Sequence, residues 1–160
     1  MRSTRRLALT LTLLAPLAAR AQEEPTGPQP ELPKEKITIV TKDGQKHVLN
    51  VEVARTPQQQ QVGEMFRKEV PPDGGMLFDW GVTRESNMWM RNTEAPLDML
   101  FIGPDGTIRH IAEDTVPYSE AIISSGGPVR ATLEVAAGTA KRLGVVVGDK
   151  VLAQEFGTGL

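Results

Sequence analysis

Short runs of alternating apolar and polar residues fill most of the chain, and turn-forming residues separate them. Residues 37–40 and 47–53 are two such runs, and Asp43-Gly44 lies between them as a typical hairpin turn. Residues 97–102 and 107–112 flank Gly103-Pro104-Asp105-Gly106, which is the clearest hairpin signal in the sequence. The pattern therefore predicts two antiparallel hairpins.

More short strands are expected over residues 76–80, 87–90, 129–135, 145–147 and 150–152. The alternation is cleanest over residues 129–135. A period of two residues directs Val129, Ala131, Leu133 and Val135 inward, and it directs Arg130, Thr132 and Glu134 outward.

Two short helices interrupt the strands. Thr56 followed by Pro57 and Gln59 has the form of a capping box with proline at the first helical position. Val62, Met65 and Phe66 follow at helical spacing and predict one buried face. A second helix is expected over residues 139–143, ending at Gly144 in a left-handed cap. Together these elements predict a mainly β fold: a compact single-domain β-sandwich or barrel with two short helices.

The amino-terminal residues have the form of an export signal. Arg2, Arg5 and Arg6 precede a short apolar run, and Ala19-Arg20-Ala21 is a typical cleavage site, so residues 1–21 are expected to be a signal peptide cut after Ala21. Residues 22–34 contain four prolines and are expected to form a disordered tether. One domain follows over residues 35–160, in a periplasmic or secreted protein.

Charge and cysteine content narrow the possible partners. Cleavage removes four arginines and no acidic residue, so the formal charge goes from −2 to −6. An acidic surface argues against nucleic acid and anionic membranes, which require clustered lysine and arginine. The sequence has no cysteine, so no disulfide supports the fold and none can carry a lipid anchor. No cofactor motif is present, and no membrane insertion is expected after cleavage.

The segment over residues 75–98 mixes large apolar side chains with small polar ones, which is typical of the lining of a small site. Trp89, Asn92, Thr93 and Asp98 are its candidate ligand-binding residues. Asp98 alternates with apolar neighbours on a predicted strand, where a carboxylate needs hydrogen bonds. It can pin the loop by accepting N–H groups of the turn over residues 91–93, or it can act as a base with a perturbed pKa.

The methionines suggest a second kind of site. Met88 and Met90 lie on one face of a predicted strand, and thioethers suit Cu(I). The same residues lie within apolar segments, where methionine commonly fills a core, and this interpretation is favoured. His47 and His110 belong to separate hairpins, so the spacing supports neither a zinc site nor a Ser-His-Asp triad.

Several motifs resemble the signature of the DUF192 (UPF0127) family. They are GEMFR at residues 63–67, GMLF at 75–78, WMRNT at 89–93 and PLD at 96–98, with Leu133-Glu134 and Gly148-Asp149 in the same order. Glu64 departs from the family pattern because that place is usually apolar, and a frequent cysteine is replaced by Pro117-Tyr118-Ser119. The resemblance implies a mainly β sandwich and no established activity.

Three functional hypotheses follow. The favoured one is a non-catalytic module that binds a small molecule or an envelope component, with Trp89 as an apolar wall and Asn92, Thr93 and Asp98 as polar contacts. Few side chains suited to catalysis are present, which argues against an enzyme. The alternative is nevertheless a hydrolase or lyase with Asp98 as base and Glu134 as partner. A copper-handling module through Met88 and Met90 is the third.

Overall fold

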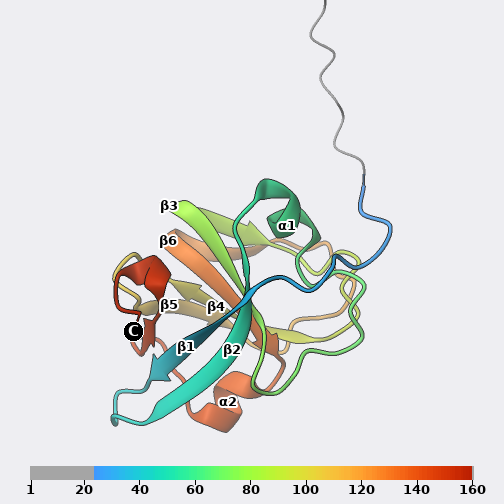
Figure 1. Ribbon diagram of the computed structural model, residues 1–160. Coiled ribbons are helices and arrows are strands. Elements are labelled where there is room, and N and C mark those ends of the chain that lie inside the picture. Colours follow the sequence, from blue (N-terminus) through green and yellow to red (C-terminus); the bar gives the residue numbers. More distant parts are fainter. Residues whose placement is uncertain (1–23, 160) are drawn as a thin grey trace, which may run out of the picture.

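Residues 24–159, which the computed structural model describes, form one seven-stranded sheet that curls into a nearly closed barrel (Figure 1). The strands follow the order β5-β4-β6-β3-β2-β1-β7. A bridge between Thr107 and Lys150 connects the two ends of this order and brings the sheet close to closure. The strands are β1 (Lys34–Val40), β2 (Lys46–Ala54), β3 (Met76–Met88), β4 (Leu97–Ile102), β5 (Ile108–Ala112), β6 (Ile123–Ala136) and β7 (Lys150–Leu152). The predicted mainly β barrel is confirmed.

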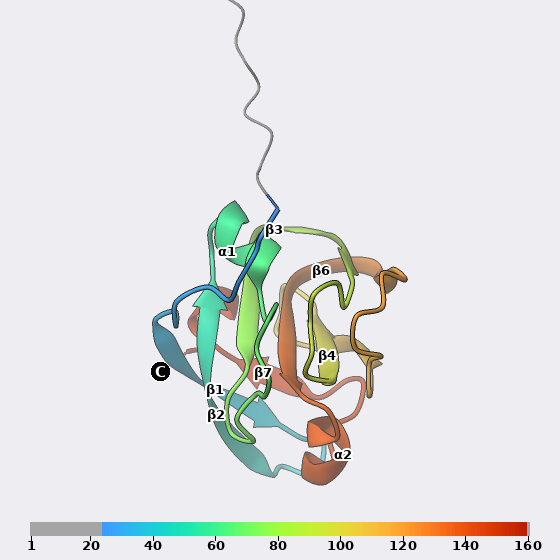
Figure 2. The ribbon, with the colours of Figure 1, turned by 90° about the vertical axis from the view of Figure 1, so that its right-hand side faces the viewer.

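The two helices lie at opposite ends of the barrel (Figures 1 and 2). Helix α1 (Pro57–Val62) has the predicted capping box between Thr56 and Gln59, and α2 (Thr139–Leu143) ends in the predicted left-handed cap at Gly144. A short 3-10 helix, η1 (Gln154–Phe156), follows β7. Within residues 24–159, no helix combines the length and the apolar character needed to cross a bilayer.

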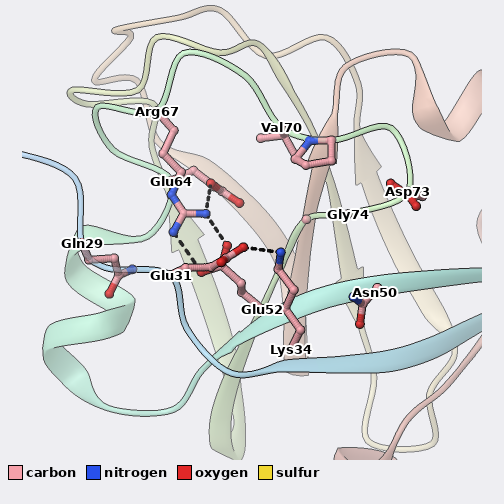
Figure 3. A pocket seen from close by; sticks show the side chains of 12 residues that line it. Gln29, Glu31, Lys34, Asn50, Glu52, Glu64, Arg67, Val70, Asp73 and Gly74 are labelled. Atoms are coloured by element: carbon pink, nitrogen blue, oxygen red, sulfur yellow. Dashed lines mark hydrogen bonds and ion pairs between the residues drawn. The ribbon is translucent and has the colours of Figure 1, made fainter.

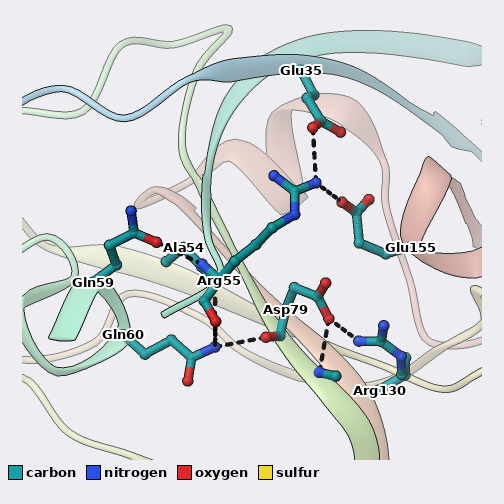
Figure 4. A network of polar contacts seen from close by, with 9 residues as sticks. Glu35, Ala54, Arg55, Gln59, Gln60, Asp79, Arg130 and Glu155 are labelled. Atoms are coloured by element: carbon teal, nitrogen blue, oxygen red, sulfur yellow. Dashed lines mark hydrogen bonds and ion pairs between the residues drawn. The ribbon is translucent and has the colours of Figure 1, made fainter. Parts of the chain in front are cut away.

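Polar contacts fix α1 against the sheet. Gln60 Nε2 donates to the carbonyl oxygen of Asp79 on β3 at 2.6 Å (Figure 4). Arg55, just before the helix, pairs with Glu35 at 2.8 Å and also with Glu155, which connects β2 to β1 and η1. These contacts hold the amino end of α1 and the strand that lines the site in one arrangement.

Several predicted boundaries are wrong. Residues 76–80 and 87–88 belong to one long strand, β3, whose pairing with β6 shifts register after Asp79, and Trp89 and Met90 lie in the loop beyond its end. Helix α1 stops at Gly63, so Met65 and Phe66 lie in the turn that follows. Residues 145–147 form a turn instead of a strand, because the carboxylate of Asp149 accepts the N–H of Val146 at 2.7 Å.

The amino-terminal segment also differs from the expectation of a disordered tether over the part that the structure describes. Residues 24–33 lie against the barrel: Gln29 Nε2 donates to the carbonyl of Gly63 at 3.0 Å, and the N–H of Leu32 donates to Glu52 at 2.6 Å. The predicted signal peptide and its cleavage site lie outside the described residues.

Both faces of the central strands are buried, which the alternation pattern did not predict. The barrel interior holds one apolar cluster that includes Leu77, Leu100 and Leu133. A second cluster covers the outer face of β3, β4 and β6, where loop residues such as Val70 and Met90 pack on strand residues such as Phe101. The outer face is therefore a second core with loops for its cover.

Candidate functional site

A cleft of about 320 Å³ opens at the edge of this outer core, between α1 and the carboxyl-terminal half of β3. We call it the tryptophan cleft. The turn after α1, strand β3, the loop after β3 and strand β6 all contribute to it. Its principal lining residues are Val62, Glu64, Met65, Phe78, Trp80, Arg84, Met88, Trp89, Thr93 and Glu134. Such a mixture of apolar walls and a few polar groups suits a small ligand.

The structure places two of the four predicted site residues at the cleft. Trp89 is 42% exposed, and Thr93 is buried with its hydroxyl donating to the carbonyl of Arg91 at 3.1 Å. Asn92 has a positive φ of 53° and supports the turn, since its carbonyl accepts the N–H of Phe66 at 2.8 Å. Asn92 therefore shapes the loop and does not line the cleft.

Asp98 lies away from the cleft. Its side chain is 0% exposed, and its two carboxylate oxygens accept the N–H groups of Asp114 and Ala140, each at 2.9 Å. The predicted donors in the turn over residues 91–93 are wrong, but the loop-pinning role itself is present. Asp98 ties the loop after β5 and the first turn of α2 to β4, and no open face is left for it to contact a ligand or abstract a proton.

Glu134 points outward as the alternation predicts, but it is not exposed to water. It does point out of the barrel, but the loops that cover the outer face bury it, and only 4% of it is exposed. A glutamate that points outward is expected to form an ion pair with an arginine such as Arg91 or Arg130, but Arg130 pairs with Asp79 and Arg91 with Glu24 and Glu120. Among the described residues, nothing forms a hydrogen bond or an ion pair with its carboxylate. Glu134 is thus a buried carboxyl group at the floor of the cleft without a partner.

Asp98 and Glu134 also cannot act as a pair. Across β4 and β6, Asp98 lies opposite Val135 and Met99 lies opposite Glu134. Neighbouring residues on a strand point to opposite faces of the sheet, so the two carboxyl groups are separated by the sheet itself. The two-carboxylate arrangement that the enzymatic hypothesis needs is not formed.

Glu64 is the second carboxyl group of the cleft and is only 3% exposed. It lies between the cleft and a neighbouring groove of about 470 Å³, the arginine groove, which Arg67 and Glu52 also line (Figure 3). Arg67 donates to both oxygens of Glu52, at 2.6 and 2.9 Å. Its contact with Oε2 of Glu64 at 3.1 Å is an ion pair without hydrogen-bond geometry. One guanidinium therefore serves two carboxylates unequally.

The electrostatics follow from this sharing. Burial opposes ionisation of Glu52, but the hydrogen bonds from Arg67 and the N–H of Leu32, together with the charges of Arg67 and Lys34, outweigh it and lower the pKa of that carboxyl. Burial raises the pKa of Glu64 to about 7, with Arg67 opposing the shift and Glu52 adding to it. Burial and the nearby Glu64 raise the pKa of Glu134 well above its usual value, against a smaller opposing effect of Arg67. The cleft therefore holds two carboxyl groups that do not ionise readily together.

The methionines of the copper hypothesis belong to the outer core. Met90 is fully buried, and its sulfur accepts the hydroxyl of Thr115 at 3.2 Å. Met88 is 9% exposed and packs in the same apolar cluster, at the edge of the cleft. The two thioethers thus do not form an accessible pair. Within the described part of the chain, no three His, Cys, Asp or Glu side chains are grouped so that they could hold a metal ion.

Sequence reasoning missed Glu64 and Trp80 as site residues and treated Glu134 only as a partner of other groups. Two signals were available. Glu64 stands where the DUF192 pattern is usually apolar, and Glu134 belongs to a signature block although the alternation directs it outward. A charged residue in an otherwise apolar signature is a reasonable sign of a buried polar site.

Comparisons with known proteins agree with the resemblance to the DUF192 family. The family model DUF192, described as "Uncharacterized ACR, COG1430", matches residues 38–153. A candidate transcription regulator of Sinorhizobium meliloti 1021 has a solved structure that is 51% identical, with a TM-score of 0.77, and the match covers 79% of this chain and 98% of that one. A protein of unknown function from Novosphingobium aromaticivorans DSM 12444 is 38% identical, with a TM-score of 0.74, over 87% of this chain and 99% of that one. No curated protein matches the chain.

Proposed function

The chain belongs to the DUF192 family, and we propose that it is a non-catalytic binding module that takes a small ligand into the tryptophan cleft. The apolar part of the ligand would lie against Trp89, and a hydrogen-bonding group would reach the carboxyl of Glu134. As part of the same proposal, the protein acts outside the cytoplasm, on a metabolite or on a component of the cell envelope.

The unpartnered carboxyl of Glu134 carries this proposal. None of the described residues donates to this carboxyl, yet its oxygens are not sealed off among the buried unpartnered atoms of the described chain, so a group in the cleft can reach them. Glu134 lines the same cleft as Trp89, whose indole stays 42% exposed. A ligand that covers Trp89 and donates to Glu134 would bury the indole and supply the hydrogen bond that the protein does not provide.

Other roles receive less support from the site. A base at Asp98 would need an open carboxylate, and both of its oxygens accept backbone N–H groups. The Sinorhizobium relative is named a candidate transcription regulator. A regulator that acted by binding nucleic acid would need clustered lysine and arginine, whereas this chain has a formal charge of −2.

A thermal-shift screen with envelope metabolites and glycans tests the proposal. A true ligand should stabilise the chain, and Trp89→Ala should weaken its binding by about 2 kcal/mol or more, as truncation of a buried aromatic anchor usually does. Tyr118→Ala is the matched control, because Tyr118 is an exposed aromatic residue outside the cleft. The proposal fails if every stabilising compound binds the Trp89→Ala variant as tightly as the unchanged chain.

A further inference from the structure

We propose that the ligand of the tryptophan cleft is a small organic cation, whose amine or guanidinium group lies between Glu64 and Glu134 while its apolar body lies against Trp89. This inference rests on the proposed binding function and specifies the chemistry of the ligand. Three observations support it: the charge balance of the buried carboxyl groups, the missing partner of Glu134, and the cations that already lie on the tryptophan rings.

The buried acidic groups outnumber the cations that serve them. Glu52, Glu64 and Glu134 are all buried, at 5%, 3% and 4% exposure. Arg67 gives its two hydrogen bonds to Glu52 and only an ion pair of 3.1 Å to Glu64. The two carboxyl groups on the side of the cleft therefore have no cation of their own, and a cation that enters the cleft would pair with them as they ionise.

Glu134 shows independently that a group is missing. It is more than nine-tenths buried, it lines the cleft, and none of the described residues donates to it. Oε2 of Glu64, which lines the same cleft, also lacks a hydrogen bond of good geometry. A neutral donor would satisfy the hydrogen bonds alone, whereas an ammonium or guanidinium would satisfy the hydrogen bonds and the charge.

The walls favour an organic cation over a metal ion. The guanidinium of Arg84 lies 4.3 Å from the ring centroid of Trp80, and that of Arg91 lies 5.6 Å from the ring centroid of Trp89. Both distances are within the range of cation–π attraction, so these rings already attract cations from the chain itself. A hydrated metal ion requires oxygen ligands and water, which the apolar side chains of Met65 and Phe78 do not supply.

Binding of a cation must also displace protons. The charged groups that face Glu134 are Glu64 and Arg67 from the turn after α1, Glu52 from β2 and Arg84 from β3. Burial raises the pKa of Glu64 to about 7, and burial with the repulsion from Glu64 raises that of Glu134 further above its usual value. A bound cation favours the ionised carboxylates, so it releases protons, and its affinity rises with pH through about pH 7.

Calorimetric titration with phenethylamine and phenethyl alcohol tests the inference, because the two probes differ only in the charged group. At about pH 8 the amine should bind the chain at least about tenfold more tightly than the alcohol, and the ratio should fall toward about pH 5. Titration in two buffers of different ionisation enthalpy should show proton release for the amine alone. Glu134→Gln should weaken the amine about tenfold and leave the alcohol unchanged. Glu85→Gln is the matched control, since Glu85 is exposed on β3 outside the cleft.

The outcomes separate this inference from the proposed function. If the two probes bind equally and Trp89→Ala loses both, the ligand is not selected for its positive charge, which would overturn this inference while the cleft remains a binding site. No binding of the amine up to about 10 mM at high pH would overturn the cation as well, and the metabolite screen would then judge the proposed function separately. If Glu134→Gln does not fold, the inference is still tested on the unchanged chain by the ratio of the affinities of the two probes and by the proton release on binding of the amine.

Discussion

Asp98 and Glu134 are two buried carboxyl groups on adjacent strands, one register position apart, and they differ in almost everything except burial. Asp98 faces the barrel interior and accepts one backbone N–H on each oxygen. Glu134 faces the outer core, lines a cleft and has no donor among the described residues. The sheet thus separates a carboxylate whose hydrogen bonds the fold supplies from one whose hydrogen bonds it does not supply.

The comparison teaches that burial alone does not distinguish a structural acid from a site acid. What distinguishes them is whether the protein itself supplies the hydrogen bonds that the carboxylate needs. Glu64 lies between the two cases, because Arg67 contacts it but is already bonded to Glu52. Substitutions at these positions should therefore differ in both size and sign.

The largest effect is expected for Asp98→Ala. It leaves the N–H groups of Asp114 and Ala140 without acceptors and should lower the free energy of unfolding by about 4 kcal/mol. Chemical denaturation with urea measures this, and Asp73→Ala is the control because Asp73 is exposed. A loss below about 1 kcal/mol would break the comparison, since Asp98 would then be no more structural than a surface acid.

Glu64→Gln should stabilise the protein, but only at high pH. The folded-state pKa of about 7 lies above the usual 4.5, so the stability that the bound proton contributes is fully present below about pH 4.5 and is lost as the pH rises through 7. The unchanged chain should lose about 3 kcal/mol over this range from this group, and the variant should not. Unfolding free energies measured from about pH 4 to 8 test this, and parallel curves for the two proteins would contradict it.

Thr132→Val should cost about 1–2 kcal/mol. Thr132 is fully buried on the outer face of β6, where its hydroxyl accepts the indole N–H of Trp80 at 3.3 Å and lies 3.3 Å from the hydroxyl of Ser86. Valine keeps the shape and leaves those groups unpaired. Thr83→Val, at an exposed position on β3, is the control for the same chemical change. Equal denaturation midpoints for the two variants would contradict the prediction, because the hydrogen bonds of the Thr132 hydroxyl would then add no stability.

Glu134→Gln should have the smallest effect on stability. At about pH 5 the carboxyl of Glu134 is protonated, because burial and Glu64 raise its pKa, so a neutral amide of the same shape should change the free energy of unfolding by less than about 0.5 kcal/mol. Thermal unfolding at that pH measures the difference against the unchanged chain. A large loss would mean that the protein does supply partners to Glu134, and the contrast with Asp98 would disappear.

The chain's local patterns predict much of the fold. Turn residues and alternation predict the hairpins β1–β2 and β4–β5, and capping residues predict both helices, because hairpin turns and helix caps depend on neighbouring residues. The prediction fails where long-range contacts decide the outcome. Residues 76–88 form one strand because β6 pairs with both of its ends, within residues 76–79 and 84–88, across shifts in register. Residues 145–147 form a turn because Asp149 bonds back to Val146.

For the site, the sequence predicts the family signature, Trp89 as an apolar wall, and the mixture of polar and apolar groups around residue 90. Which carboxyl group faces a cavity is not readable. Alternation along β6 directs Glu134 away from the barrel, and that direction is correct. Whether the outer face meets water or a layer of loops depends on segments far apart in the chain, such as the turn after α1 and the loop after β3. Local periodicity reports the direction of a side chain, and only the packing of distant segments decides its solvent, its partners and its charge.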